Sequence, residues 1–284
     1  MIAITGASGH LGQLTLSRLI EKLPAGNLVA IVRNPEKLEG YKGSDMAIKT
    51  ADYEDTAALV KALDGVETLL QISSSTSGAV ATQQESNVVR AAAAAGVRHI
   101  VYTSTLSPGP DAIFLAGQTC MATEQAIKNH GFTFTFFRNS MYFETIPLFI
   151  GSAVKDGQIY YPGGNGKISF VSREDIAEAL AVVLTEPDRH HDVEYRVTGE
   201  EAFSFEDLAT LLKSEKGLNA AYHDLPEDAF VAELGKAGMP QDEIDFTVSM
   251  AASIRAGEFA AVDDQLEKLL ERRRRGLSMY IEEL

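Results

Sequence analysis

A glycine-rich segment lies near the start of the chain, between a short apolar run at residues 2–5 and a helical pattern. It reads Gly6, Ala7, Ser8, Gly9, His10, Leu11 and Gly12. In a strand–turn–helix setting, the first glycine permits a tight turn, the second lets the backbone approach a pyrophosphate, and the third lets the helix pack closely on the strand. The helix start also directs free N–H groups at phosphates. The segment predicts a dinucleotide-binding turn, spaced GxxGxxG instead of GxGxxG; a glycine-rich turn without a ligand is the alternative.

A cationic side chain, Arg33, follows the second apolar run at residues 28–32. In dinucleotide sites this strand end approaches the adenosine ribose, where an acid binds the 2′-hydroxyl of NAD. A guanidinium suits a 2′-phosphate instead, because its planar donor fork never loses its charge. Arg33 therefore favours NADPH as the cofactor. Glu36 nearby leaves NADH possible, and an exposed arginine without a ligand is the alternative.

Polar residues follow the third and fourth predicted strands. Asp52 and Tyr53 stand where adenine would lie, with the carboxylate able to accept from the amino group and the ring able to flank the base. An ordinary helix cap is an equal alternative. Ser73, Ser74 and Ser75 open a run of small hydroxyl residues at the carboxyl edge of the predicted sheet, next to the crevice where doubly wound folds bind ligands. We expect them to contact the ribose and nicotinamide, with a flexible loop as the alternative.

Alternating strand and helix patterns must position these side chains. Strands are predicted at 2–5, 28–32, 46–49, 68–72, 99–103 and 133–137, and helices at about 10–22, 54–64, 81–95 and 115–129. This rhythm predicts an α/β fold, a Rossmann doubly wound parallel sheet with right-handed connections.

The rhythm changes after residue 138. Strands are predicted at 159–161, 193–197 and 220–223, capping boxes begin at Ser172 and Ser204, and the remainder is mostly helical. We expect a nucleotide-binding domain at 1–138, completed by strands and a helix within 158–197. Residues 139–157 and 198–284 then form a small, mostly helical C-terminal lobe that binds substrate.

Acidic residues outnumber basic ones, 40 to 25, so the formal net charge is −15. This charge repels polyanions, and we expect no nucleic-acid partner. The run from Arg272 to Arg275 follows an apolar periodic stretch and precedes Gly276. It is typical of the last turn of a helix, where cations meet the carbonyl end of the dipole; contact with a phosphate is the alternative.

Cys120 is the only cysteine, which points to a reducing compartment. The first residues lack a signal-peptide pattern, and no apolar run is long enough to span a membrane. We therefore expect a cytoplasmic protein without membrane contact, and a homo-oligomer is possible. The histidines show no metal-binding spacing, so no metal is expected.

Four stretches resemble the NmrA-like group of atypical short-chain dehydrogenases, and within it the type 2 NADPH:quinone oxidoreductases and triphenylmethane-dye reductases. They are MIAITGASGHLG at 1–12, AIVRNPEK at 30–37, AAGVRHIVYTS at 94–104 and FRNSMY at 137–142, of which the second and fourth are the specific ones. The resemblance runs through nearly the whole chain. It implies NADPH binding at the glycine turn, at Arg33, at Ser73 to Ser75 and at Arg138 to Phe143.

The last of these stretches contains Arg138, Asn139, Ser140, Tyr142 and Phe143. By resemblance, Asn139 and Tyr142 line the nicotinamide and substrate pocket. The alternatives are a structural ion pair for Arg138 and a place in the core for the two aromatic rings.

Ordinary short-chain dehydrogenases use a Tyr-x-x-x-Lys pair as acid and base. If Glu124 is the glutamate that follows this pair, its positions hold Ala116 and Cys120, which cannot do that work, and the catalytic residues stay unknown. We expect Cys120 to be an inert, packed thiol.

The expected function is NAD(P)H-dependent hydride transfer to a small-molecule electron acceptor, a quinone or another planar electrophile, because such an acceptor needs little from a protein acid. An NADP(H)-binding, redox-sensing regulator without turnover is the alternative, motivated by the missing pair. A sugar-nucleotide epimerase ranks last, since it normally needs that pair.

Overall fold

The computed structural model describes residues 1–284, which form two compact units. Unit 1 comprises residues 1–105, 119–138 and 176–195, and unit 2 comprises residues 106–118, 139–175 and 196–284.

Unit 1 is built around a seven-stranded sheet in the order β3-β2-β1-β4-β5-β6-β8. Its strands are β1 (Ile2–Thr5), β2 (Leu28–Val32), β3 (Ala47–Thr50), β4 (Thr68–Gln71), β5 (His99–Thr105), β6 (Thr133–Asn139) and β8 (Val193–Val197). The order reverses at β1, whose two neighbours β2 and β4 both run parallel to it. The β2–β3 and β4–β5 pairs are parallel as well. This is the predicted doubly wound sheet, with the carboxyl ends of β1 and β4 side by side at the reversal.

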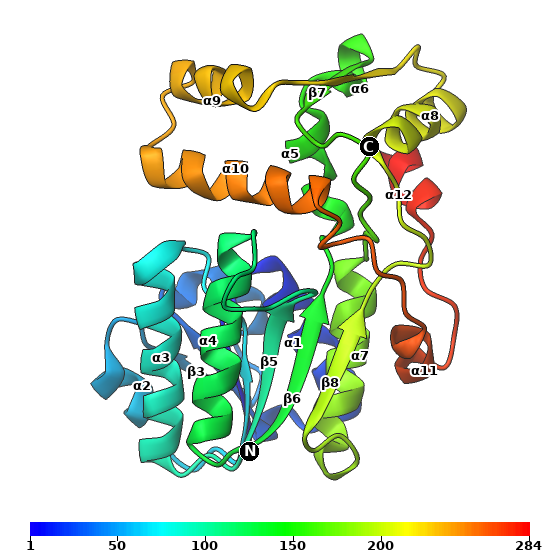
Figure 1. The fold of residues 1–284 in the computed structure, drawn as a ribbon. Helices are drawn as coiled ribbons and strands as arrows, with labels where there is room; N and C mark the ends of the chain where they lie inside the picture. The colour runs from blue at the N-terminus through cyan, green and yellow to red at the C-terminus, as the bar shows by residue number, and fades with distance from the viewer. The chain divides into compact units, whose positions relative to one another are not determined.

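Helices cover both faces of this sheet. They are α1 (His10–Lys22), α2 (Thr56–Ala62), α3 (Gly78–Ala95), α4 (Leu115–Asn129) and α7 (Arg173–Thr185). Figure 1 shows α2, α3 and α4 in front of the sheet and α1 behind it. On the front face, Val88 and Ala92 of α3 and Ile127 of α4 join one buried apolar cluster with strand residues. The run of alanines in α3 has no bulk, which suits a helix that packs close to its sheet.

The predicted strands are confirmed to within two residues at each end, and β1, β2 and β8 match their predicted bounds. Helices α1 and α4 also match. Helix α2 is shorter than the predicted 54–64, because Asp55 caps it by accepting from the Ala58 N–H. Helix α3 starts three residues before the predicted residue 81. Its first turn is exposed, so the apolar pattern begins only at the buried Ala81.

Unit 2 is mostly helical. It contains α5 (Ile146–Ile150), α6 (Ala153–Asp156), α8 (Phe205–Lys216), α9 (Glu227–Lys236), α10 (Gln241–Arg255), α11 (Gln265–Leu270), α12 (Leu277–Glu283) and the parallel pair β7 (Gln158–Tyr161) and β9 (Ala221–Asp224). Short 3-10 helices occur in both units: η1 (Ala25–Asn27), η2 (Pro35–Tyr41) and η4 (Pro187–Arg189) in unit 1, and η3 (Phe143–Thr145) in unit 2. Phe149, Tyr161, Phe170 and Phe205 meet in the core of this unit. The capping box at Ser204 is confirmed, since its hydroxyl accepts from the Asp207 N–H.

The prediction for Arg272 to Arg275 is wrong. Helix α11 ends at Leu270, and the four arginines lie in the segment that follows it. Arg272 pairs with the buried Asp175 at 2.8 Å, Arg275 pairs with Glu174 at 2.6 Å, and Arg274 is itself buried, with Nη1 donating to the Thr198 and Gly199 carbonyls. Buried carbonyls and carboxylates bind these guanidiniums more strongly than a helix dipole would. The cluster is therefore structural.

No helix has both the length and the apolar character that a bilayer crossing requires.

Candidate functional site

A cavity of about 250 Å³ opens in unit 1 at the carboxyl ends of β1, β2 and β4. The sequence-predicted residues that line it are Gly6, Ser8, Gly9, Arg33, Asp52, Tyr53, Ser73, Ser74 and Ser75. Four segments far apart in the sequence thus meet at one place, because parallel strands bring their carboxyl ends to the same edge of a sheet.

The backbone of the glycine turn has the tight turn and the close helix approach that the glycine pattern predicts. Gly6 has φ +65°, which an L side chain rarely adopts. A Cβ on Gly12 would overlap the Gly6 carbonyl oxygen and lie 2.7 Å from Ala7 Cα, so only glycine lets α1 start this close to the turn. Ala7 and Leu11 point into the core and His10 is exposed, so these three side chains do not line the cavity.

Two cations and one acid lie where the chain leaves β2 and β3. Arg33 is 71% exposed, and its Nε is 4.0 Å from Asp52 Oδ2. Lys37, four residues after Arg33, lines the same cavity, and the sequence analysis missed it. A second cation following the strand-end arginine was the available signal. Arg33 and Lys37 together offer a phosphate two positive charges at the cavity rim.

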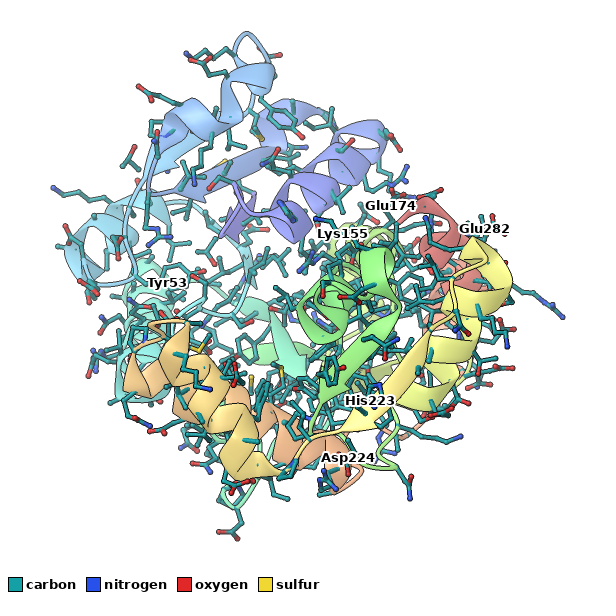
Figure 2. The ribbon with its side chains drawn as sticks, turned by 90° about the horizontal axis from the view of Figure 1, so that it is seen from above. Tyr53, Lys155, Glu174, His223, Asp224 and Glu282 are labelled. Carbon is teal, nitrogen blue, oxygen red and sulfur yellow. The ribbon has the colours of Figure 1, made fainter.

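Asp52 does not cap a helix, since Asp55 fills that role; Asp52 accepts from the Glu54 N–H at 2.9 Å instead. Tyr53 belongs to the same loop, and Figure 2 marks it. Its hydroxyl lies 2.7 Å from Thr5 Oγ1 and donates to the Ile72 carbonyl at 2.7 Å. Burial raises the pKa of Tyr53 well above its ordinary value, so it stays a neutral donor. The ring is thereby fixed across the ends of β1 and β4.

The loop from Ser73 to Thr76 is held by hydrogen bonds, which argues against a flexible loop. The Ser73 N–H donates to Thr103 Oγ1 at 2.9 Å. The Ser74 N–H donates to Glu85 Oε1 at 2.9 Å, and the Ser74 hydroxyl donates to Gln84 Oε1 at 2.6 Å. Gln84 also lines the cavity. Gln84 and Glu85 were not predicted as site residues, although two polar residues on the apolar stripe between Ala81 and Val88 were a signal.

Arg138 forms the ion pair that was its alternative interpretation. Its guanidinium binds both oxygens of Glu124, at 3.0 and 2.6 Å, and a third contact of 2.8 Å reaches Glu194. Glu124 is 1% exposed and also accepts from the Ser104 hydroxyl at 2.7 Å. These contacts tie α4 to the ends of β5 and β6 and to the start of β8.

The stretch after Arg138 belongs to unit 2. Ser140 is buried, with its hydroxyl 3.1 Å from that of Ser169, and Phe143 packs in the core against Tyr280. Tyr142 lies under the Arg173 guanidinium, 4.7 Å from the ring centre. Asn139 is different, because its buried Oδ1 has no hydrogen-bond partner in the structure. An orphaned buried acceptor is costly, and a bound ligand that donates to it would remove the cost.

Cys120 packs on the front face of the sheet in unit 1. Burial raises the pKa of its thiol to about 12, and the charge of Glu85 adds to the effect. The thiol sulfur lies 3.4 Å from Tyr102 Oη. A protonated, buried thiol is a poor nucleophile, which supports the inert interpretation.

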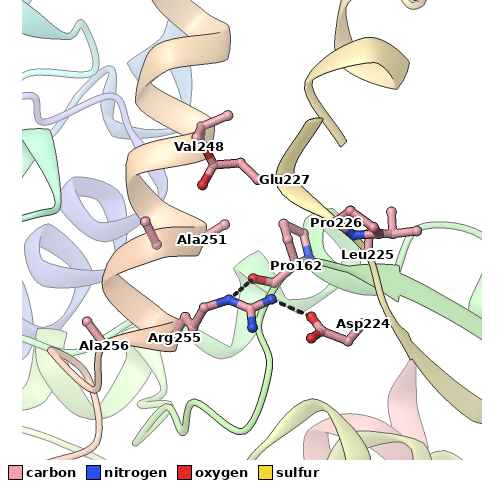
Figure 3. A pocket seen from close by; sticks show the side chains of 10 residues that line it. Pro162, Asp224, Leu225, Pro226, Glu227, Val248, Ala251, Arg255 and Ala256 are labelled. Carbon is pink, nitrogen blue, oxygen red and sulfur yellow. Dashed lines mark hydrogen bonds and ion pairs between the residues drawn. The ribbon is translucent and has the colours of Figure 1, made fainter. Parts of the chain in front are cut away.

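A larger cavity, about 530 Å³, lies in unit 2 between α10 and the residues that follow β9. Figure 3 shows the Arg255 guanidinium reaching the Pro162 carbonyl, at 3.2 Å, and Asp224, at 2.6 Å. Asp224 follows His223 at the end of β9 (Figure 2). Arg255 and Asp224 already bind one another, so the cavity presents mainly the apolar side chains of α10, such as Val248 and Ala251.

No group of three or more His, Cys, Asp or Glu side chains is placed to hold a metal ion in residues 1–284.

The sequence model of the NmrA-like family matches residues 1–277. Quinone oxidoreductase 2 of Escherichia coli (strain K12) is 37% identical over 270 residues, which cover 95% of this chain and 93% of that protein. An NAD(P)H azoreductase of Xenophilus azovorans is 26% identical, over 96% of this chain and 93% of that protein.

Two solved structures share the fold over their full lengths. The NADPH-dependent quinone oxidoreductase of Escherichia coli, complexed with NADPH, superposes with a TM-score of 0.93 at 34% identity, covering 100% of this chain and 99% of that one. The triphenylmethane reductase of a Citrobacter species, complexed with NADP(H), gives 0.90 at 31% identity with the same coverage.

Proposed function

The chain belongs to the NmrA-like family, and we propose that it is an oxidoreductase that transfers hydride from NADPH to a quinone-like or other planar electrophile. Its similarity to quinone oxidoreductase 2 extends over almost the whole of both chains. The NADPH and NADP(H) complexes of its structural neighbours support the choice of cofactor.

The cavity of unit 1 is the observation that carries the proposal. It combines a glycine turn at a helix start with two cations, Arg33 and Lys37, at the rim. The N–H groups of such a turn bind a pyrophosphate, and the cations suit the 2′-phosphate that distinguishes NADPH from NADH. Asp52 and Tyr53 then flank the adenine, and the loop Ser73–Ser75 contacts the ribose and nicotinamide.

Unit 1 is thus the nucleotide-binding domain, and unit 2 supplies the pocket for the acceptor. Asn139 and Tyr142 of unit 2 are our candidates to line it. Asn139 Oδ1, buried and without a partner, suits the carboxamide of the nicotinamide, which carries an N–H₂ donor.

NADPH supplies the hydride when it is bound, and the protein's contribution is to hold a flat acceptor against it and exclude water. The side chains at the two positions of the missing tyrosine and lysine do not replace them, since Ala116 has no proton to give and the Cys120 thiol is buried. A reduced quinone oxygen takes its protons from solvent, so the missing pair does not prevent this reaction. It does disfavour reactions that need a protein acid.

An assay of NADPH oxidation with a panel of benzoquinones, run beside a binding titration with NADPH and NADH, tests the proposal. We expect quinone-dependent loss of the NADPH absorbance and tighter binding of NADPH than of NADH. Tight binding without turnover on any acceptor would refute the reductase and leave the second candidate, an NADP(H)-sensing regulator, which the inert Cys120 and the missing catalytic pair favour.

A further inference from the structure

A carboxylate whose hydrogen-bond partners are all uncharged lies inside unit 1, at Glu85 on α3. Glu85 is only 2% exposed. Oε1 accepts from the Ser74 N–H at 2.9 Å, and Oε2 accepts from the Thr123 hydroxyl at 2.7 Å and from the Tyr102 hydroxyl. A buried carboxylate without a cation is costly, so its retention calls for a role.

Of these three partners, only Ser74 belongs to the nucleotide cavity. The preceding residue is anchored in the same way, because the Ser73 N–H donates to Thr103 Oγ1. Two successive backbone donors of the loop therefore point into the protein, at acceptors on α3 and β5. Both N–H groups are therefore satisfied inside the protein, and together they hold the loop in one orientation.

Helix α3 anchors the cavity at two further points. Gln84 Oε1 accepts from the hydroxyls of Ser74 and Thr76, at 2.6 and 3.0 Å. Asn87 Nδ2 donates to the Tyr53 carbonyl at 2.8 Å. One face of α3 thus fixes both loops that border the cavity, and Glu85 is the member of this face that lies deepest in the protein.

We propose that Glu85 is a positioning residue for the cofactor: by accepting the Ser74 N–H, it sets the loop Ser73–Ser75 in the orientation that contacts the bound dinucleotide. This inference rests on the proposed function. A loop ordered before binding loses less conformational entropy when the ligand arrives, so removing the anchor weakens binding without removing any atom that touches the ligand.

Two substitutions of Glu85 separate the acceptor from the charge. In Glu85→Gln, the amide oxygen still accepts the Ser74 N–H, while the amide N–H₂ donates to the hydroxyls of Tyr102 and Thr123. These hydroxyls can turn to other acceptors, Cys120 Sγ at 3.4 Å and the Thr119 carbonyl at 3.0 Å. Glu85→Leu keeps a similar volume and leaves the Ser74 N–H without an acceptor.

We expect Glu85→Leu to raise the Kd for NADPH about tenfold, the scale of one lost hydrogen bond. The KM for NADPH should rise by a similar factor, and kcat at saturating NADPH should change much less. Glu85→Gln should restore the wild-type Kd to within about twofold. The matched control is Thr123→Val, which removes another donor to the same carboxylate but leaves the Ser74 anchor, and its Kd should stay close to that of the wild type.

Hydrogen exchange at the peptide that contains Ser74 gives a second measurement, made without cofactor. Exchange there should be faster in Glu85→Leu and unchanged in Glu85→Gln. If Glu85→Leu does not fold, Glu85→Asp replaces it, because the shorter carboxylate keeps its charge but falls short of the Ser74 N–H; its Kd should rise as well.

Equal NADPH affinity in the wild type and in a folded Glu85→Leu or Glu85→Asp variant would overturn this role. So would a Kd for Glu85→Gln as weak as that for Glu85→Leu. Failure of the proposed function gives a different result, since the wild type itself would then not bind NADPH or not reduce any quinone.

Discussion

Arg33 and Lys37 at the cavity rim are the residues on which cofactor choice depends. Both lie within five residues of the end of β2 and line the cavity. Arg33 pairs with Asp52 at 4.0 Å. An exposed ion pair at this distance contributes little stability, so breaking the Arg33–Asp52 pair costs little free energy. Arg33 is therefore available to an incoming phosphate.

Arg33→Ala should weaken NADPH binding about tenfold and leave NADH binding nearly unchanged, because one charge-assisted contact to a 2′-phosphate is lost. The measurement is a pair of binding titrations at low and high salt, and the difference should shrink at high salt. Arg98→Ala is the control, since it removes an equally exposed cation that pairs only with Glu67 in the structure. An unchanged NADPH to NADH affinity ratio in Arg33→Ala would refute the role of this residue.

The buried carboxyl of Glu85 makes a second prediction at this scale, which concerns stability. Burial raises the pKa of Glu85 above its ordinary value, despite hydrogen bonds from Tyr102, Ser74 and Thr123 that lower it. The folded chain therefore holds this proton more tightly than the unfolded chain does. As the pH rises above about 4.3, the ordinary value for glutamate, the unfolded chain loses this proton before the folded chain does, and the wild type loses stability.

Glu85→Gln lacks this titration, so its Tm should exceed that of the wild type by a margin that grows as the pH rises above about 4. A chain of this size shifts by about 2–4 °C per kcal/mol, so thermal melts at a series of pH values can resolve the trend. A margin that does not change with pH would contradict the assignment.

At the scale of elements, the start of α1 depends on a close approach that only Gly12 permits. A Cβ at this position would lie 2.7 Å from Ala7 Cα and 2.9 Å from the Ala7 carbonyl carbon, and real Cβ atoms do not come so near. Helix and turn must then separate, and the free N–H groups of the helix start move with them.

Gly12→Ala should lower the free energy of unfolding by about 1–3 kcal/mol, the usual cost of overpacking, and weaken NADPH binding at least as strongly as Arg33→Ala does. Denaturant melts and a titration with NADPH check the two effects. Gly40→Ala is the matched control, because nothing lies within 4 Å of a Cβ there. A Gly12→Ala protein with wild-type stability and affinity would show that the turn tolerates a side chain.

The strands and helices of unit 1 are predictable because local sequence signals mark where they begin and end. The apolar run of β2 stops at Arg33, and Gly96, at φ +78°, ends α3 just before β5. The start of α3 is not predictable in this way, since its first turn is exposed and carries no apolar pattern.

Site residues are predictable from the sequence where they directly follow a strand, as Arg33 and the serine loop do. Glu85 interrupts an apolar stripe, which is a signal, but its partners in the serine loop and on α4 are set only when α3 packs in the fold. The arginines after α11 were misjudged for the same reason: their partners, Glu174 and Asp175, stand about 100 residues earlier in the chain. Long-range pairs of this kind leave no periodic trace in a single sequence.

At the scale of the whole molecule, one buried acid binds the C-terminal segment at two points, beside the contacts that Arg274 makes with Thr198 and Gly199. Asp175 stands where the chain passes from unit 2 into unit 1, and its side chain is 1% exposed. Oδ1 binds Arg272 at 2.8 Å, and Oδ2 accepts from the Arg275 N–H at 2.7 Å. Through these contacts, the segment that leads to α12 is held at the start of α7.

Asp175→Ala should lower the free energy of unfolding by about 3 kcal/mol, because breaking a buried pair leaves its other groups without compensation. Urea unfolding gives the value, and Glu233→Ala, which breaks an exposed pair with Lys236, is the control at about 0–1 kcal/mol. Proteolysis should also cleave the segment after Leu270 sooner in Asp175→Ala than in the control. If both variants unfold at the same urea concentration, the segment is held by its apolar contacts, such as those of Leu277 and Ile281, and not by Asp175.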